Sequence, residues 1–117
     1  MTETQKLIAK AKRTALEDQF LASIRALGLP EPWREYRFCK RRWRFDFFWE
    51  VRQADESLRR VAVEIMGGTH IHGRRSHAGS DGYEADCRKA NTAALFDVRL
   101  LRFTGAMVKS LEAAQVV

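Results

Sequence analysis

Apolar and polar residues recur with two different periods along the chain, and each period predicts a type of element. In residues 4–27 the apolar residues recur at spacings of three, four and seven, which places them on one face of an amphipathic helix. These residues are Ala9, Leu16, Phe20, Ile24 and Leu27. Gly28 follows as a C-cap and Pro30 lies just beyond it, so we expect the helix to end there.

Two later segments alternate with a period of two, as strands do. In residues 42–50, one face carries Trp43, Phe45, Phe47 and Trp49, and the other carries Arg42, Arg44, Asp46 and Phe48. In residues 60–66, one face carries Val61, Val63 and Ile65, and the other carries Ala62, Glu64 and Met66. A polar turn at 53–57 joins the segments, which favours a hairpin in which Asp46 and Glu64 share one polar face.

The rest of the pattern completes a mixed architecture. Residues 34–38 are expected to form a short strand or entry segment, 83–95 a helix, 98–103 a strand and 105–114 a final helix. Between them, residues 67–82 form a loop with five of the seven glycines and all three histidines. The order α-β-β-loop-α-β-α predicts an α/β (mixed) fold, with a mixed central sheet flanked by helices in a single domain of residues 1–117. The helical crossover predicts that the last two strands are parallel.

The charge of the chain adds a class of partner to this picture. Lys and Arg number 21 against 15 acids, which gives a net charge of +6 and a pI near 9.8. Many of the basic residues lie just before the first long strand or after the second: Arg37, Lys40, Arg41, Arg42, Arg44, Arg74, Arg75, Arg88 and Lys89. Basic groups on both sides of two acids favour a phosphate-binding surface around a metal site. A solvated basic face is the alternative.

Other features of the composition indicate the compartment. No apolar run approaches the roughly 20 residues of a membrane span, and the first residues lack the apolar region of a signal peptide. Cys39 and Cys87 are too few for a disulfide framework. We therefore expect a cytoplasmic protein with reduced cysteines and no membrane partner.

Asp46 and Glu64 are the candidates for chemistry because carboxylates are disfavoured in strands and costly to bury without a partner. In so basic a chain, a divalent cation such as Mg²⁺ or Mn²⁺ would pair them, and the carbonyl of Ile65 could add a third oxygen ligand. The alternative is a set of cross-strand salt bridges. These would join Asp46 to Arg42, Arg44 or Arg99, and Glu64 to Arg102.

Five short motifs follow one another over about residues 15–108. They are Trp43-Arg44-Phe45-Asp46-Phe47, Val63-Glu64-Ile65-Met66-Gly67-Gly68, Ser76-His77-Ala78-Gly79, Asp86-Cys87-Arg88-Lys89-Ala90-Asn91 and Leu101-Arg102-Phe103-Thr104. Their order resembles the PD-(D/E)XK nuclease superfamily, and within it small phage- or prophage-encoded endonucleases of the very-short-patch-repair type. The resemblance implies a restriction-endonuclease-like core, a bacterial or phage origin, and Asp46 and Glu64 as metal ligands.

The chain departs from the superfamily at Met66, where the signature places a lysine that stabilises developing charge. Lys89, on one face of its helix with Asp86, could bring that charge instead, and an ordinary ion pair between these two residues is the alternative. His77 is the histidine expected to assist catalysis, by the resemblance. A zinc site of His70, His72 and Cys87 is disfavoured by its spacing.

The sequence thus predicts a Mg²⁺- or Mn²⁺-dependent endonuclease acting on DNA. Asp46 and Glu64 would bind metal, while Lys89 or His77 would assist the attacking water or the leaving group. The residues expected to hold the DNA backbone are Arg42, Arg44, Arg74, Arg75 and Arg88. The accessory residues are Glu17 or Glu35 in the metal shell, together with Asp86 and Asn91. The alternatives are a Holliday-junction resolvase, for which a homodimer would be needed, and a non-catalytic nucleic-acid-binding protein.

Overall fold

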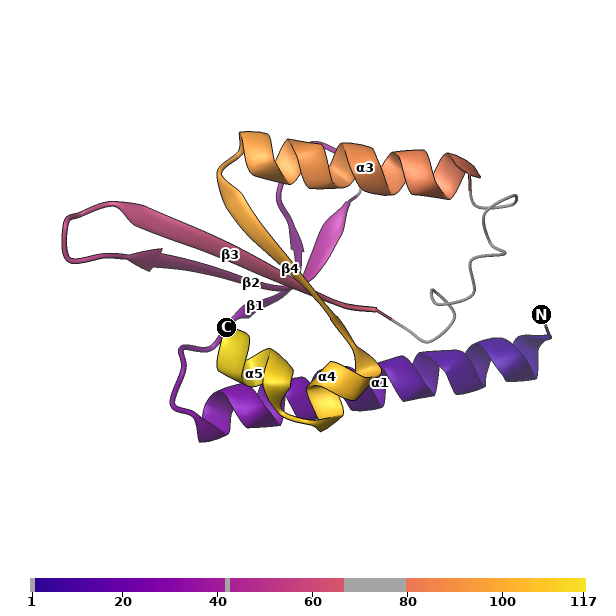
Figure 1. The fold of residues 1–117 in the computed structure, drawn as a ribbon. Helices are drawn as coiled ribbons and strands as arrows, with labels where there is room; N and C mark the ends of the chain where they lie inside the picture. Colours follow the sequence, from indigo (N-terminus) through magenta and orange to yellow (C-terminus); the bar gives the residue numbers. More distant parts are fainter. Residues whose placement is uncertain (1, 42, 67–79) are drawn as a thin grey trace.

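A four-stranded mixed sheet separates two helical layers (Figure 1). The computed structural model describes residues 2–41, 43–66 and 80–117, with the side chains of 80 and 81 left aside. The strands are β1 (Trp33–Arg37), β2 (Arg44–Arg52), β3 (Leu58–Met66) and β4 (Val98–Thr104), and they lie in the order β1-β2-β3-β4. The first two pairs are antiparallel and the last is parallel, which confirms the expected hairpin and crossover.

The helices are α1 (Glu3–Ala26), α3 (Ser80–Leu95), α4 (Gly105–Lys109) and α5 (Glu112–Val116). Helix α1 begins with a capping box between Thr2 and Gln5, and it ends before Gly28, whose φ of 73° needs no strain in a glycine. The single helix expected over 105–114 is wrong. Leu111 adopts a left-handed φ of 70° and divides the segment into α4 and α5.

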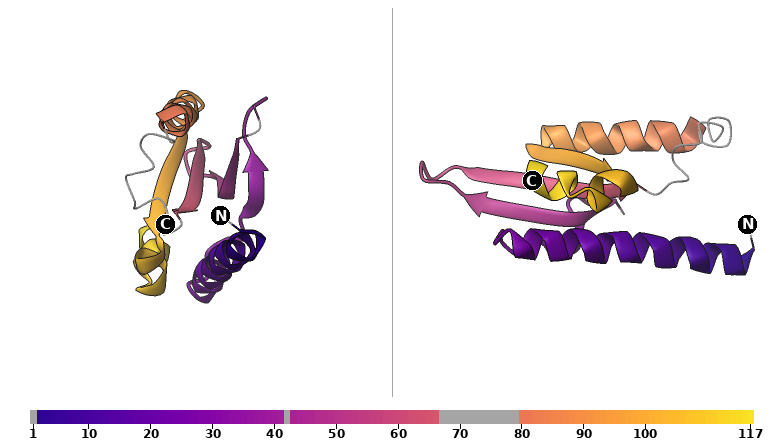
Figure 2. Two further views of the ribbon diagram at one scale, coloured as in Figure 1. Left: turned by 90° about the vertical axis from the view of Figure 1, so that its right-hand side faces the viewer. Right: turned by 60° about the horizontal axis from the view of Figure 1, so that its bottom comes forward.

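Each face of the sheet has its own apolar core. One face packs against α1, α4 and α5, and its buried residues include Phe20, Ile24, Phe47, Val63 and Phe103. The other face packs against α3, with the buried residues Phe45, Phe48, Ala62, Ala93 and Val98. The two perpendicular views in Figures 1 and 2 place α1 and α3 on opposite sides of the sheet. The side from which a strand residue emerges therefore decides which helix it meets.

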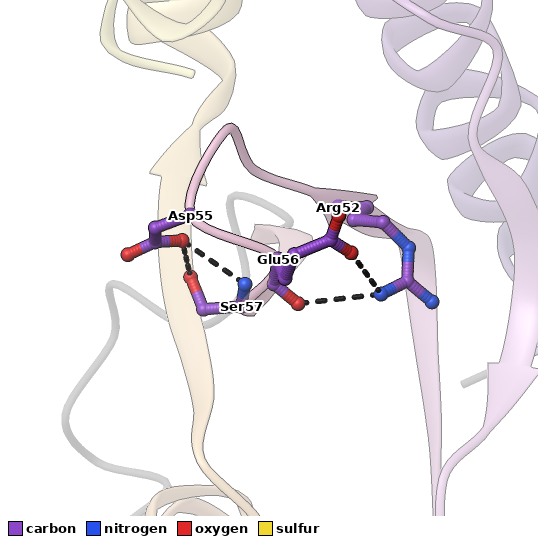
Figure 3. A network of polar contacts seen from close by, with 4 residues as sticks. All are labelled: Arg52, Asp55, Glu56 and Ser57. Atoms are coloured by element: carbon purple, nitrogen blue, oxygen red, sulfur yellow. Dashed lines mark hydrogen bonds and ion pairs between the residues drawn. The ribbon is translucent and has the colours of Figure 1, made fainter.

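The turn between β2 and β3 is held by its own polar side chains (Figure 3). The Asp55 carboxylate accepts a hydrogen bond from the backbone N–H of Ser57 at 3.0 Å, which is an Asx turn. The Arg52 guanidinium donates to the Glu56 carbonyl at 3.3 Å, and Glu56 has a φ of 74°. These contacts fix the register in which Phe47 lies opposite Val63.

Residues 67–79 of the expected loop over 67–82 lie outside the described residues, and α3 begins at Ser80, three residues before the predicted start of the helix at 83. Along the described ranges, no helix combines the length and apolar character that crossing a bilayer requires.

Candidate metal site

The regular alternation of β2 is broken at Asp46. Phe45 and Phe48 are three residues apart, yet both lie in the core beneath α3, whereas Phe47 packs on the opposite face with α1. The expectation that Phe45 shares a face with Phe47 is therefore wrong. An extra residue at the break changes which face the following side chains occupy, as it does in a β-bulge.

Strand β1 has a matching break at Glu35. Trp33 and Tyr36 stack on each other at 5.5 Å between ring centroids, and both stack on Phe48, so they lie on one face although they are three residues apart. Glu35 has a φ of 50°, a left-handed conformation that is strained in a residue with a β-carbon. The register pairs residue 34 with 47 and residue 36 with 45, which places Glu35 opposite Asp46. Both strands therefore deviate at the same point without losing register.

The double break brings three carboxylates together on the α1 face. Glu17, Glu35 and Asp46 each offer an oxygen, and these oxygens all lie within 4.8 Å of one another. Glu17 is buried with 8% of its surface exposed, Asp46 is half-buried and Glu35 is exposed. Three separate elements, α1, β1 and β2, thus each contribute one acid to a site that opens to solvent at Glu35.

The electrostatics of this cluster are those of an anionic site short of positive charge. Burial first, and then the carboxylates of Glu17, Glu35 and Glu64, raise the pKa of Asp46 to about 6. A hydrogen bond from the backbone N–H of Ile65 to Asp46 Oδ2, at 2.8 Å, acts in the opposite direction. Asp46 is therefore held in place by β3, and it forms no ion pair within the part of the chain that the structure describes.

Arg34 provides the positive charge closest to the cluster among the described ion pairs. Its guanidinium lies 3.1 Å from Glu17 Oε1 and 4.7 Å from the centre of the Phe47 ring. Among the described residues, one arginine against three carboxylates leaves a net negative charge at the site. An unbalanced set of oxygen ligands is what hard divalent cations such as Mg²⁺ and Mn²⁺ require, so the donor set fits such an ion.

Glu64 faces the other way, towards α3. Its Oε2 lies 3.1 Å from Lys89 Nζ, and its Oε1 lies 3.9 Å from Arg102, which is its partner residue on β4. The side chains of Glu64 and Lys89 are 16% and 12% exposed. Oε1 is buried without a hydrogen-bond partner among the described residues. Lys89 also donates to the carbonyl of Arg44 at 2.8 Å, which ties α3 to the start of β2.

The expectation that Asp46 and Glu64 share a polar face is therefore wrong. The prediction assumed strict alternation along β2, and the break at Asp46 turns its carboxylate towards α1. Glu64 takes part in the cross-strand contact with Arg102 that the sequence offered as the alternative. The alternative pairing of Asp86 with Lys89 does not occur among the described ion pairs, because Lys89 bonds to Glu64.

The other predicted site residues are scattered or lie outside the described residues. Arg42, His70, His72, Arg74, Arg75 and His77 belong to the ranges that the structure does not describe. Arg44, Cys87, Asp86 and Asn91 are exposed, and Arg88 forms an exposed ion pair with Glu84 at 3.4 Å. Ile65 lies beside Asp46 through its N–H, while the ligand role predicted for its carbonyl stays a prediction.

Sequence reasoning gave Glu17 and Glu35 only an accessory place and did not single out Arg34. The apolar run Phe47-Phe48-Trp49 does not mark the break, because these residues alternate between the two buried faces of the sheet. Comparison with known proteins adds no further assignment: no family model, no curated protein and no solved structure matches this chain.

Proposed function

We propose that the protein is a metal-dependent endonuclease that hydrolyses DNA phosphodiester bonds, with Mg²⁺ or Mn²⁺ held by Glu17, Glu35 and Asp46. The observation that carries the proposal is the convergence of these three carboxylates within 4.8 Å in a chain with a net charge of +6. Ionised carboxylates that lie close together repel one another, which costs free energy. Here three of them occur together in a strongly basic protein. A divalent cation together with a polyanionic substrate accounts for both features.

The chemistry follows from the charges on each side. A divalent ion at this site would neutralise charge on the scissile phosphate and lower the pKa of a bound water. Glu17 and Asp46 are the less exposed of the three ligands, and they are fixed by α1 and β2. Glu35 is the exposed ligand, and its second carboxylate oxygen would accept a proton from the attacking water. The four-stranded mixed sheet corresponds, in this proposal, to the restriction-endonuclease-like core suggested by the sequence motifs.

Glu64 and Lys89 receive a positioning role in this proposal. Lys89 bonds both to Glu64 and to the carbonyl of Arg44, two residues before Asp46. It therefore fixes the strand that carries Asp46 from the opposite face of the sheet. Direct assistance to the water by Lys89 or His77 stays a prediction, and His77 lies outside the described residues.

The test compares two acids of the cluster, Asp46 on β2 and Glu17 on α1, with Glu50, which lies elsewhere on β2. Purified wild type, Asp46→Asn and Glu17→Gln are incubated with linear, nicked, mismatched and four-way-junction DNA in Mg²⁺, Mn²⁺ or EDTA. We expect cleavage only with metal, and a loss of at least about a hundredfold in both variants, because each loses a metal ligand. Glu50→Gln is the matched control, since Glu50 pairs with Arg60 at 2.8 Å outside the acidic cluster and should retain activity.

Thermal unfolding tests metal binding at the same site independently of cleavage. Mn²⁺ should raise the melting temperature of the wild type and of Glu50→Gln, because binding to the folded state stabilises it. The shift should vanish in Asp46→Asn. Cleavage that survives in both Asp46→Asn and Glu17→Gln would contradict the proposal. DNA binding without cleavage or a metal shift would favour the non-catalytic alternative, in which Arg34 alone compensates the acids. Selective cleavage of the junction would favour a resolvase.

A further inference from the structure

The first half of α1 extends beyond the other described elements. Every residue from Thr2 to Ala15 is exposed, and burial along the helix begins at Leu16 and Glu17. Figure 1 and the right-hand view of Figure 2 show this half of the helix passing beyond the ends of the strands. Most helices in proteins are stabilised by packing an apolar face, and this segment has no such face against the described residues. We call residues 3–15 the α1 arm.

The arm carries a row of cations on one defined face. Lys6, Lys10 and Arg13 are separated by four and three residues, and Glu17 follows four residues after Arg13. Side chains at these spacings lie above one another on a helix. The same row continues into the buried Phe20 and Ile24, so the three cations lie on the side of the helix that bears the acidic cluster.

The axial distances suit a polyanion that runs from the arm into the site. With a rise of about 1.5 Å per residue, the cations are spaced about 4.5–6 Å apart, and Arg13 precedes Glu17 by about 6 Å. One strand of duplex DNA presents a charge about every 3.4 Å along its axis. Three flexible basic side chains at this spacing can each reach a separate phosphate.

Contacts among the residues that the structure describes do not account for the row. The described ion pair of Lys6 with Glu3, at 3.4 Å, joins side chains that are 58% and 87% exposed, so it contributes little to stability. No ion pair of Lys10 or Arg13 occurs among the described residues. Of the arm's residues, only Leu7 and Ile8 are large and apolar. Two such residues are too few for the apolar face of a membrane-bound helix or the repeated seam of a coiled coil.

We propose that the α1 arm binds the phosphate backbone of DNA and guides one strand to the acidic cluster, with Lys6, Lys10 and Arg13 each contacting a phosphate. This inference rests on the proposed function for the identity of the polyanion. It adds the direction from which the substrate approaches, along α1 towards Glu17.

The test measures DNA binding in EDTA, where the outcome does not depend on cleavage. Binding of a labelled duplex of about 25 base pairs is followed by fluorescence anisotropy from 50 to 300 mM KCl. The arm variant combines Lys6→Gln, Lys10→Gln and Arg13→Gln. The control combines Lys12→Gln, Arg59→Gln and Arg99→Gln, which removes the same charge from exposed positions off the row. A variant with Lys6→Arg, Lys10→Arg and Arg13→Lys keeps the charge, and circular dichroism checks that the helices form.

Each phosphate contact contributes about 0.9 to the slope of log K against log salt, so the slope of the arm variant should fall in magnitude by about 2–3. The control should change by less than about 1, and the charge-conserving variant should match the wild type. Equal losses in the arm variant and the control would overturn the inference, as would a wild type without salt-sensitive binding. A slope of log K against log salt that is unchanged in the arm variant would also overturn the inference. In that case, a loss of binding to anionic vesicles would indicate a membrane surface as the partner of the arm, and a loss of self-association in sedimentation would indicate a second copy of the chain. If the slope falls in magnitude but no metal-dependent cleavage occurs, DNA binding by the α1 arm is supported and the nuclease proposal fails.

Discussion

Asp46 and Glu64 are carboxylates on neighbouring strands, yet the charged side chains around them differ in sign. Asp46 lies with Glu17 and Glu35 and has Arg34 as the cation of its cluster, whereas Glu64 is alone between two cations, Lys89 and Arg102. On the α1 face, burial and like charges raise the pKa of Asp46 to about 6. On the α3 face, positive charge compensates the acid. The comparison shows that the sheet separates an anionic site from a structural ion pair.

The two faces of the sheet therefore differ in their charge balance. The α1 face is short of positive charge, so adding a cation should stabilise it. The α3 face is balanced, so removing either charge should destabilise it. Three substitutions test this difference, in order of decreasing expected effect.

Lys89→Met should have the largest effect, a loss of about 2–3 kcal/mol in the free energy of unfolding. The substitution keeps the apolar volume of the side chain but leaves Glu64 with only Arg102, at 3.9 Å. Urea denaturation measures the change. Lys109→Met removes an exposed lysine from α4 and should stay within about 0.5 kcal/mol of the wild type. Adding Mn²⁺ should not restore the stability of Lys89→Met, and restoration would mean that the α3 face also binds metal.

Arg34→Gln should cost about 1–2 kcal/mol in EDTA, because the nearly buried Glu17 loses its described partner. Here Mn²⁺ should restore most of the loss, since the ion supplies the charge that the arginine gave. Urea denaturation with and without Mn²⁺ measures both effects. If Mn²⁺ rescues Arg34→Gln and Lys89→Met equally, or neither of them, the proposed difference between the faces is incorrect.

Asp46→Asn should stabilise the metal-free protein by about 1 kcal/mol at pH 8, because the partly exposed carboxylate is costly to ionise there. The amide oxygen can still accept the Ile65 N–H. Because the folded pKa of Asp46 is about 6 and its ordinary value is 3.8, the folded wild type binds more protons between these values. The wild type therefore loses stability relative to Asp46→Asn as the pH rises from about 4 to 6.

Denaturation in EDTA at pH 4, 6 and 8 measures this dependence. The difference in stability between the two proteins should be smallest at pH 4, where Asp46 is protonated in the folded state and partly protonated in the unfolded state, and it should be constant above pH 7. A gap that widens towards low pH would mean that Asp46 is stabilised in its charged form, contrary to the charge shortage on the α1 face.

Much of the fold could be predicted from the sequence because it depends on local signals. The apolar spacing of Phe20 and Ile24 predicted α1, Gly28 marked its end, and the crossover predicted the parallel pairing of β3 and β4. The final helix was predicted as one element because nothing local marks Leu111, an ordinary helix former, as left-handed.

The candidate site was predicted only in part. The sequence identified Asp46 as an acid in an apolar strand and named Glu17 and Glu35 as possible ligands, but it paired Asp46 with Glu64 by assuming a period of two. A break in alternation places a side chain on the opposite face of the sheet, yet it requires no change in local residue preference. For this reason the partner of Asp46 could not be deduced from its own strand.

By itself, then, the sequence determined the types of element, their order, the strong positive charge and the presence of acids inside strands, since each of these follows from residue type and spacing along the chain. Only the tertiary structure decided which acids meet. The paired breaks at Glu35 and Asp46, and the position of α1 beneath them, are set by packing between segments far apart in sequence. Electrostatic interactions depend on distance in space, and that distance exists only once the sheet has formed between its helices.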